Sequence, residues 1–564
     1  MNIYKQLSKE RKELQATKEL PDWITTHSWQ MLKEKYLDKG ESLRDRFMSI
    51  AGTAAEYLAD DWDTKEKWKY KFYDLFWKGL LIPSTPILAN MGKDKGCQVS
   101  CSGGYIGDSV FDFYNGQLEA ALLSKNGFGT SGYLGDIRSR GSSISGIRGG
   151  ASGIVPVFAD FVQVSRDISQ GSSRRGAWAG YVEIDHPDFF ELVNFISKNP
   201  DDANVGWIIS NEFIDRLDLG DPDAVERYQK ALKLKMITGK GYFFFVDKVN
   251  DLAPGWYADY PIKASNLCTE IALPSSLVET FTCIISSQNL AKWKQFDKNT
   301  IFDSFVFLHC VALDFIEKGS KIQGLEKAVE FTKNHMALGL GTLGYHTYLQ
   351  DNSIPFESLE AHLWNTEVYK TIWEETEAAS RFLAATFGEC KMTKGTGLAN
   401  ATRIAIAPNL SSSVFGGGIS QGIEPVYKNA YIQGSASGEM ERINPSLLPI
   451  MKKRGVFNHE TISSIIKNKG SVQWVDWLDD HEKEVFKTAF EIDQLVIIRE
   501  AANRQRYIDQ AQSINLFFSA DESEEYISSV HKEAFKNPYI KSLYYIRSES
   551  GVQTNKGECI ACGS

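Results

Sequence analysis

The chain is poor in cysteine and proline and has no long apolar run. Its 564 residues include only eight cysteines and 16 prolines. Such scattered cysteines do not form the dense disulfide framework of a small secreted domain, so a reducing, cytoplasmic location is expected. No stretch of about 18 apolar residues occurs, so the sequence predicts no membrane span. The charged segment Met1–Gln15 lacks the apolar centre of a signal peptide.

The chain also lacks an excess of basic residues. Lysine and arginine number 62 against 72 acidic residues, and the net charge is −10. A broad nucleic-acid-binding surface is therefore not expected, although local basic sites for nucleotide phosphates are compatible with this balance. The sequence contains no tandem repeat, no Walker-type phosphate loop and no His-Glu-x-x-His zinc motif.

Short apolar runs alternate with glycine-rich turns and amphipathic stretches over most of the chain. Residues 1–80 predict a small helical region, which ends at the proline-containing segment 82–86. Residues 81–520 predict an α/β domain with strands buried among helices, and residues 521–564 predict a C-terminal segment with a polar tail. The apolar runs that predict strands include Tyr242–Val246, Phe281–Ile285 and Ile404–Ala407.

Two cysteines near the end, Cys559 and Cys562, form a Cys-x-x-Cys pair behind the polar stretch 546–556. Thiols at this spacing can close into a disulfide, and the pKa of one of them is typically lowered. On a mobile segment, such a dithiol can reduce a buried partner and then be reduced from outside. The pattern therefore predicts a redox shuttle that serves a site inside the protein.

A candidate for that site is the segment 265–271. In an extended segment, Asn266, Cys268 and Glu270 would point to one side, because side chains alternate with a period of two. A thiol flanked by an amide and a carboxylate suits a reactive sulfur beside a general base. The alternative is a strand edge with one buried cysteine and two solvated polar side chains.

The other cysteines are open to several interpretations. Cys283 lies in an apolar run and is typical of a small core residue. Cys97 and Cys101 form a Cys-x-x-x-Cys pair that is compatible with metal binding, redox activity or no role. The spacing permits a zinc site made from this pair and the terminal dithiol, but more than 400 residues separate the two. Cys310 and Cys390 lie in helix-like contexts that favour structural roles.

Three further motifs have both a structural and a functional interpretation. Gly339–Gly344 matches the Gly-x-Gly-x-x-Gly dinucleotide pattern, but a helix-like stretch precedes it, so we expect close helix packing or a turn. Pro408–Ser413 follows a strand-like run and either holds a phosphate on its hydroxyls and N–H groups or caps a helix. Tyr544 and Tyr545 would point to opposite faces of a strand and are typical packing residues.

Together these motifs resemble the large, catalytic subunit of class I ribonucleotide reductase, from about Phe76 to the C-terminus. No single motif is decisive, but their joint occurrence in the family order is specific. The motifs are Pro83–Leu88, Ser100 with Cys101, Ser265–Pro274, Cys283, Pro408–Ser413, Tyr544 with Tyr545, and the terminal Cys-x-x-Cys.

The resemblance implies a ten-stranded α/β barrel with a central finger loop that carries Cys268. Cys268 would form a transient thiyl radical that removes the 3′ hydrogen of a ribonucleoside diphosphate. Glu270 would take the proton of the 3′ hydroxyl, and Asn266 would hold the sugar hydroxyls. Cys101 and Cys283 would supply two electrons and become a disulfide, while the 2′ hydroxyl leaves as water. The product would be a deoxyribonucleotide for DNA synthesis.

In the same family pattern, Cys559 and Cys562 would reduce the active-site disulfide and then be reduced by thioredoxin or glutaredoxin. Leu410 stands where some relatives carry an acidic residue, which makes the loop less negative but leaves its hydroxyl and backbone donors. Cys97 is an extra thiol close to Cys101. The resemblance assigns substrate binding to Thr85, Ser100, Cys101, Gly127, Asn266, Cys268, Glu270, Pro408, Asn409, Leu410, Ser411, Ser412 and Ser413.

The resemblance also implies nucleotide effectors, namely dATP or ATP, dTTP and dGTP, that select the substrate. Asp108, Ser109 and Arg138 would contact the effector at a homodimer interface. Gln170 and Arg174 belong to a loop that would relay the effector's identity to the substrate base. The alternative for this loop is a solvated surface segment.

Tyr544 and Tyr545 favour class I over a cobalamin-dependent single-chain reductase, which also ends in Cys-x-x-Cys. The pair would carry a radical from a separate small subunit that holds the metal centre, so no metal is expected on this chain. A regulatory scaffold would lack Cys268 or Glu270, and a general thiol–disulfide oxidoreductase would need a thioredoxin-like fold. Residues 1–80 lack the Lys-Arg-Asp-Gly-type segment of the family's ATP-binding cone, so dATP is not expected to switch off overall activity there.

Overall fold

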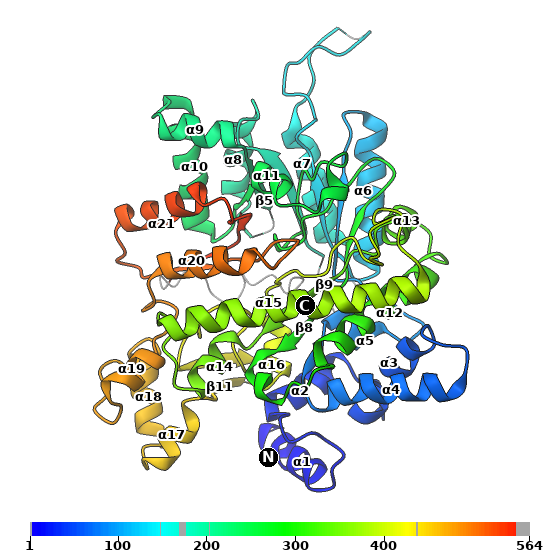
Figure 1. Ribbon diagram of the computed structural model, residues 1–564. Coiled ribbons are helices and arrows are strands. Elements are labelled where there is room, and N and C mark those ends of the chain that lie inside the picture. The colour runs from blue at the N-terminus through cyan, green and yellow to red at the C-terminus, as the bar shows by residue number, and fades with distance from the viewer. Residues whose placement is uncertain (1–2, 147, 169–175, 202, 436–437, 549–564) are drawn as a thin grey trace.

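The computed structural model describes residues 3–146, 148–168, 176–201, 203–435 and 438–548. A helical N-terminal region lies at one end of a large α/β body (Figure 1). One hydrophobic core extends from Leu20 to Ile546, so the N-terminal helices and the body pack together. Within the described ranges, no helix combines the length and the apolar content needed to cross a bilayer.

Four helices form the N-terminal region, as the sequence predicts. Polar residues cap three of them: the side chain of Thr25 accepts from the backbone N–H of Ser28, and Ser42 with Asp45 forms a capping box. The carboxylate of Asp61 caps the fourth in the same way. The helices are α1 (Ile3–Ala16), α2 (Thr26–Lys35), α3 (Leu43–Ala55) and α4 (Trp62–Trp77).

The first half of the body is a seven-stranded sheet in the order β13-β6-β5-β4-β3-β2-β7. Five consecutive strands are parallel, and helices lie between them in the chain, as in βαβ units. The parallel strands are β2 (Cys101–Tyr105), β3 (Gly129–Tyr133), β4 (Trp178–Glu183), β5 (Asn204–Ile209) and β6 (Tyr242–Phe245). The connecting helices are α6 (Val110–Lys125), α7 (Ile154–Asp167), α8 (Phe189–Lys198), α9 (Asn211–Asp218) and α10 (Pro222–Thr238).

Antiparallel strands flank this parallel set on both sides. β7 (Phe281–Cys283) pairs with β2 and leads directly into β8 (Ile285–Asn289) of the second half. β8 is parallel to β9 (Gly339–Leu343) and antiparallel to β1 (Leu81–Pro83). At the other edge, β13 (Ser542–Leu543) pairs with β6.

Backbone hydrogen bonds of the second half close the ring. The N–H of Leu340 donates to Arg403 O (2.8 Å), and that of Ile406 donates to Ala511 O (3.1 Å). The N–H of Tyr544 donates to Ile514 O (2.8 Å), which returns the ring to the segment that pairs with β6. Five extended segments, namely β8, β9, 404–407, 510–518 and 542–548, thus complete a barrel begun by the five strands β2–β6. The predicted α/β barrel is confirmed.

The expectation of helix packing or a turn at residues 339–344 is wrong, because residues 339–343 form strand β9. Glycine is required there by close approach of neighbouring segments rather than by a nucleotide. A Cβ on Gly339 would lie 2.9 Å from the Cβ of Ala405, and one on Gly341 would lie 2.7 Å from the carbonyl oxygen of Ala405. The glycines therefore let β9 pack directly against the segment 404–407.

Further helices cover the barrel, and a small lobe with its own apolar cluster extends from it. The lobe contains the hairpin β10 (Ala430–Ser435) and β11 (Gly438–Ile443) with α17 (Leu448–Lys453), α18 (His459–Lys467) and α19 (Asp480–Val485). The covering elements include α5 (Thr85–Asn90), α11 (Val246–Asp251), α12 (Thr300–Gly319), α13 (Glu326–His335), α14 (Tyr345–Asp351), α15 (Leu359–Phe387), α16 (Leu410–Phe415), α20 (Gln494–Gln505) and α21 (Glu524–Lys536). β12 (Leu516–Phe518) pairs in parallel with β14 (Ile546–Ser548). Residues 537–548, which follow α21, are called the strap.

Candidate active site

Residues 262–272, here called the finger, form a loop inside the barrel with Cys268 in its terminal turn. An antiparallel bridge between Ser265 and Ala272 closes the base of the loop. The first half of the barrel holds one side of it. The hydroxyl of Ser131 on β3 donates to Ser265 O (2.9 Å), and that of Tyr181 on β4 donates to Asn266 O (2.7 Å).

The second half of the barrel holds the other side of the finger. The hydroxyl of Ser513 donates to Cys268 O (2.5 Å) and lies 3.2 Å from Oε2 of Glu270. The hydroxyl of Ser542 donates to Thr269 O (3.1 Å). Cys268 and Glu270 are 2% and 1% exposed, so both reactive groups lie in the interior. The finger is thus fixed through its backbone carbonyls from both halves of the ring.

The terminal turn of the finger differs from the extended segment that the sequence suggests. Thr269 has a φ of +70°, a left-handed conformation that costs roughly 1–3 kcal/mol for a residue with a side chain. The turn lets Oδ1 of Asn266 accept from the N–H of Ile271 (3.2 Å), which fixes the orientation of the amide. Nδ2 of Asn266 is buried and has no hydrogen-bond partner among the described residues. A buried donor without a partner is costly, so this amide is a candidate for binding a ligand.

Cys101 and Cys283 are cross-strand partners in the β2–β7 pair. Directly opposed residues of antiparallel strands have Cβ atoms roughly 4.5–5.5 Å apart, close to the spacing of a disulfide. The thiol of Cys283 also lies 3.9 Å from Oε1 of Glu270. The structure therefore brings together four of the predicted groups, namely two paired thiols, the finger carboxylate and the finger thiol.

The serine-rich loop, residues 408–413, follows the segment 404–407, which pairs with the chain around Ser513. The N–H of Ser513 donates to Ile406 O (2.8 Å), and the loop begins two residues later at Pro408. Asn409 is locked in place: its Oδ1 accepts from the hydroxyl of Ser287 (2.8 Å), and its Nδ2 donates to Thr342 O (3.1 Å). Leu410, Ser411, Ser412 and Ser413 then form the start of α16.

Three other predicted substrate-binding residues are Thr85 at the start of α5, Ser100 just before β2 and Gly127 just before β3. The hydroxyls of Tyr36 and Thr85 are 3.1 Å apart, so an N-terminal helix end contacts the start of α5. Ser100 precedes Cys101, and its Oγ is buried without a partner among the described residues. Gly127 has a φ of +99° in the turn between α6 and β3. This turn allows Gly129 to donate its N–H to Ser100 O (2.9 Å).

The tyrosine pair belongs to the strap and is buried against Tyr242 of β6. Tyr544 and Tyr545 lie between β13 and β14 rather than in a strand, and their ring centroids are 3.9 Å apart. The expectation that they point to opposite faces is therefore wrong, because the two rings contact each other. Tyr242 on β6 completes the group, with centroids 5.0 Å from Tyr544 and 5.7 Å from Tyr545.

The predicted effector residues meet at the end of β2. Nε of Arg138 donates to Asp108 Oδ2 (2.6 Å), and Ser109 caps α6 by accepting from the N–H of Asp112. The exposed face of α6 is apolar, with Val110, Phe111, Tyr114 and Leu118 at 59–76% exposure. Gln170, Arg174, Cys559 and Cys562 lie outside the described residues.

The remaining described cysteines are buried away from the finger. Burial raises the pKa of Cys97 to about 12, and it raises the pKa values of Cys310 and Cys390 as well. A thiol is reactive as the thiolate, so these three are poor nucleophiles at neutral pH. This agrees with the structural interpretation of Cys310 and Cys390.

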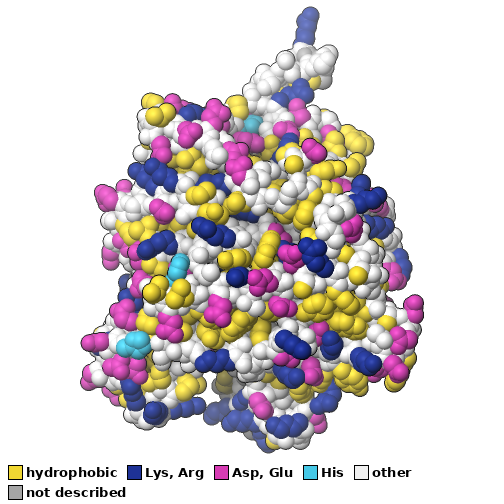
Figure 2. All heavy atoms as spheres, in the orientation of Figure 1, with side chains coloured by type: hydrophobic (Ala, Val, Ile, Leu, Met, Phe, Trp, Pro, Cys, Tyr) yellow, Lys and Arg dark blue, Asp and Glu magenta, His cyan; other side chains and the backbone are white. Residues whose placement is uncertain are grey.

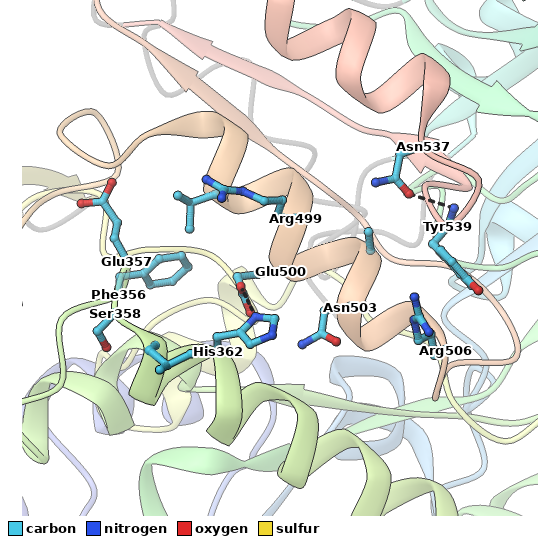
Figure 3. A pocket seen from close by; sticks show the side chains of 13 residues that line it. Phe356, Glu357, Ser358, His362, Arg499, Glu500, Asn503, Arg506, Asn537 and Tyr539 are labelled. Atoms are coloured by element: carbon cyan, nitrogen blue, oxygen red, sulfur yellow. Dashed lines mark hydrogen bonds and ion pairs between the residues drawn. The ribbon is translucent and has the colours of Figure 1, made fainter.

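A surface cavity of about 510 Å³ lies apart from the finger, between the start of α15 and α20 (Figure 3). Its wall includes the ion pair between Nδ1 of His362 and Oε1 of Glu500 (2.8 Å). Arg499 on α20 and Arg506 just after α20 also line the cavity, and Arg506 lies near Tyr539 (Figure 3). Acidic and basic side chains are interspersed over the face shown in Figure 2.

Sequence reasoning missed the residues that hold the reactive groups. Each of these residues is more than 80 positions from the finger in the sequence; they are Ser131, Tyr181, Ser513 and Ser542. Tyr242 was recognised only as part of a strand. No local signal identifies such residues, because their function arises from contacts between distant segments.

Comparison with known proteins gives a consistent result. The family model described as "Ribonucleotide reductase, barrel domain" matches residues 99–222, 221–396 and 390–546, and that described as "all-alpha domain" matches residues 23–96. A ribonucleoside-diphosphate reductase large subunit of Frog virus 3 is 32% identical, covering 96% of this chain and 98% of its own length. A large subunit from Danio rerio is 27% identical over 85% of this chain and 70% of its own. The solved class Id ribonucleotide reductase alpha subunit of Actinobacillus ureae is 36% identical, with a TM-score of 0.86 and coverage of 95% and 99%.

Proposed function

The chain belongs to the family of class I ribonucleotide reductase large subunits, and on that premise we propose that its radical chemistry takes place on Cys268. The family reaction is the reduction of ribonucleoside diphosphates. The observation that supports the assignment is the finger itself, where a buried thiol, a carboxylate and an amide with an unused donor share one turn. The barrel excludes water from this turn, which protects a reactive sulfur from side reactions.

In the proposed first step, a thiyl radical on Cys268 takes the 3′ hydrogen atom of the substrate ribose, which leaves a carbon radical and restores the thiol. The carboxylate of Glu270 accepts the proton of the 3′ hydroxyl. Nδ2 of Asn266 donates to a sugar hydroxyl and so obtains the partner that it lacks among the described residues.

The cysteine pair then supplies the reducing equivalents. Cys101 and Cys283 each contribute one electron and one proton, and the 2′ hydroxyl leaves as water while a disulfide forms between the two sulfurs. The cross-strand register supports this pairing. The return of the hydrogen from Cys268 to C3′ regenerates the thiyl radical. The balance is one ribonucleotide and two thiols converted to one deoxyribonucleotide, one disulfide and one water.

The terminal dithiol would then reset the site. Cys559 and Cys562 reduce the Cys101–Cys283 disulfide by thiol–disulfide exchange and are reduced by thioredoxin or glutaredoxin. Changing both residues to Ser is expected to leave one burst of product from pre-reduced enzyme and to prevent thioredoxin-driven turnover. Undiminished thioredoxin-driven turnover of that variant would contradict the shuttle.

The substrate's diphosphate would be held by the loop that starts at Pro408. Its donors are the backbone N–H groups and hydroxyls of residues 409–413, with Thr85 and Ser100 from the other side. The locked side chain of Asn409 and the partnerless Oγ of Ser100 support this position. Leu410 contributes no charge, so the loop does not repel the phosphates.

A nucleotide effector would bind near Asp108, Ser109 and Arg138 at the interface of a homodimer. The apolar exposed face of α6 beside these residues supports an interface, because contiguous exposed apolar side chains mark association surfaces. The small subunit, which holds the radical metal centre, would deliver the radical through Tyr544 and Tyr545. Their ring contact supports this path.

The test of the function is turnover of CDP by the purified chain with and without a radical-loaded small subunit. Formation of dCDP is expected only when the small subunit is present. Turnover by the isolated chain with adenosylcobalamin would contradict the class I route while leaving the reductase fold in place. The cytoplasmic location stays a prediction of the sequence.

A further inference from the structure

A lysine lies in the interior beside the tyrosine pair and serves no role in the chemistry above. Lys235, near the end of α10, has no exposed surface. Its Nζ donates to the carbonyl oxygen of Gly241 (3.1 Å) and to that of Tyr544. One ammonium group on α10 therefore joins the residue before β6 to the strap, and Lys235 lies 309 positions before Tyr544 in the sequence.

This ammonium group has no acidic partner among the described residues. Burial alone lowers the pKa of Lys235 to about 7. The groups that face it are the ring of Phe243, 5.5 Å from Nζ, and the buried imidazole of His531 on α21, whose own pKa is lowered to about 4 by burial. A lysine buried without an acidic partner costs stability, so what it contributes to the protein lies in the two carbonyl groups that it binds.

The two carbonyls that Lys235 binds control the placement of the aromatic group. Gly241 immediately precedes Tyr242, and its φ of +83° is a conformation that glycine adopts readily. Tyr242 and Tyr544 are in ring contact, and Tyr544 in turn contacts Tyr545. A bond from Nζ to both backbones therefore fixes the distance between β6 and the strap at the point where the tyrosine rings meet.

We propose that Lys235 is a positioning residue for radical transfer, which holds the backbone of Tyr544 so that its ring keeps the contact with Tyr545. This inference rests on the proposed role of the tyrosine pair. Misplacement of reacting groups by about 1 Å can cost roughly 10²-fold in rate. Loss of the bond from Lys235 is expected to affect the rate of radical delivery, not the binding of substrate.

The chain offers a matched control in Lys248 on α11. Its Nζ donates to the carbonyl oxygens of Ala534 (2.9 Å) and Phe535 (2.6 Å) at the end of α21, and burial lowers its pKa to about 7 too. Lys248 thus has the same chemistry and the same cost but binds a segment outside the tyrosine pair. A general effect of removing a buried lysine would appear equally at both positions.

The experiment compares Lys235→Met with Lys248→Met in the complex of this chain with a radical-loaded small subunit. Methionine keeps the volume of the stem and removes the donor. For Lys235→Met, kcat for CDP is expected to fall by about 10- to 100-fold while KM and small-subunit affinity are retained. Lys248→Met is expected to change kcat little. With 3-aminotyrosine at position 544 as a radical trap, the trapped signal in electron paramagnetic resonance is expected to fall with Lys235→Met only.

A second variant keeps the test decisive if Lys235→Met fails to fold. Lys235→Gln retains N–H donors without a charge, so its kcat is expected to lie between those of Lys235→Met and the wild type. If Lys235→Met cannot be obtained, the Lys235→Gln enzyme is compared with the wild type, and a lower kcat with unchanged KM is expected. Equal kcat values for the Lys235 and Lys248 variants, or a raised KM with unchanged kcat, would overturn the inference. Full activity of Tyr544→Phe would instead refute the proposed radical path, so the two failures are distinguishable.

Discussion

The finger and the strap both carry reactive side chains on irregular backbone, yet the protein holds them by different chemistry. Neutral hydroxyls of Ser131, Tyr181 and Ser513 donate to the finger's carbonyls. The strap depends on buried ammonium groups, from Lys235 to Tyr544 O and from its own Lys541 to the carbonyl oxygens of Asp509 and Gln510 (both 2.8 Å).

The difference follows from the chemistry that each segment performs. A fixed positive charge near the finger would stabilise the carboxylate of Glu270 and weaken it as a base, so neutral anchors suit that site. In the proposed radical path, each tyrosine of the strap loses an electron together with its own phenolic proton, so it needs no nearby base of tuned strength. Charge-assisted bonds, which are roughly twice as strong as neutral ones, are therefore tolerable there. In both segments the anchors bind the backbone and leave the side chains to react.

If the comparison holds, a reactive side chain can be changed while the backbone bonds that hold its segment remain. Cys268→Ser should reduce dCDP formation by about 10⁴-fold or more, because a hydroxyl O–H bond is too strong to yield a stored radical. Substrate binding, measured by equilibrium dialysis of CDP, should be retained since the finger's backbone bonds are unchanged. The matched control is Cys390→Ser, which replaces a buried thiol outside the barrel and should leave turnover near that of the wild type. Wild-type-like turnover of Cys268→Ser would exclude it as the radical site.

The strap's side chains should be equally indispensable. Tyr544→Phe and Tyr545→Phe each keep the ring contact and lose the phenolic O–H that is oxidised, so turnover should fall by about 10³-fold or more while nucleotide binding persists. Tyr242→Phe, which alters the third ring of the group in the same way, should retain most of the activity. If all three variants retain most of the activity, the pair acts in packing rather than in radical transfer.

Removing an anchor should have a smaller effect than removing a reactive group. Ser513→Ala leaves Cys268 O and one carboxylate oxygen of Glu270 without this donor, which should lower the free energy of unfolding by roughly 1–3 kcal/mol. The loosened tip should lower kcat by about 10- to 100-fold. Chemical denaturation and steady-state kinetics measure the two effects. Unchanged kcat with reduced stability would show that the hydroxyl has no part in orienting the finger.

The effector site should be independent of both segments. Arg138→Ala removes the partner of Asp108 and a cation for the effector's phosphates, which should weaken effector binding by about 10- to 100-fold. Without effector, the rate of CDP reduction should equal that of the wild type. Substrate preference in the presence of dTTP or dGTP should shift much less than in the wild type. A loss of basal activity would place Arg138 in the fold or the active site instead.

The last expected effect leaves catalysis aside and concerns the pH dependence of stability. The pKa of Lys235 is lowered in the folded state, so between about pH 7 and pH 10 the unfolded chain binds more protons there. The cost of the buried charge is complete below pH 7 and declines as the pH rises. The free energy of unfolding of the wild type relative to Lys235→Met should therefore increase with pH in this window, by at most about 1.4 kcal/mol per pH unit. A difference that is constant from pH 6 to pH 10 would show that the amine is not buried as described.

The sequence selected the proposed reactive groups but not the residues that hold them. The motif spacing selected Asn266, Cys268 and Glu270, because residues that perform chemistry lie close together in one segment. The conformation of the turn was not predicted, since the positive φ of Thr269 depends on bonds from Ser513 and Ser542, more than 240 residues away.

Residue composition predicted one strand of the barrel and concealed another. The apolar run at 242–246 identified β6 by composition alone. The glycine-rich run at 339–344 concealed β9, because glycine disfavours strands unless another backbone approaches closely. That approach, between Gly339 and Ala405, is a property of the assembled barrel.

The order in which the ring is completed has a consequence for the synthesis of this protein. β2 is made early, whereas the strap that pairs with β6 follows roughly 440 residues later. At about 5–20 residues per second, a nascent chain spends tens of seconds with the barrel open and the finger without the contacts from Ser513 and Ser542. The proposed radical path and the closing segment are the same piece of chain. If Tyr544 and Tyr545 carry the radical, an incomplete ribosomal product has no route by which a radical could reach Cys268, and the enzyme becomes competent only when its ring is whole.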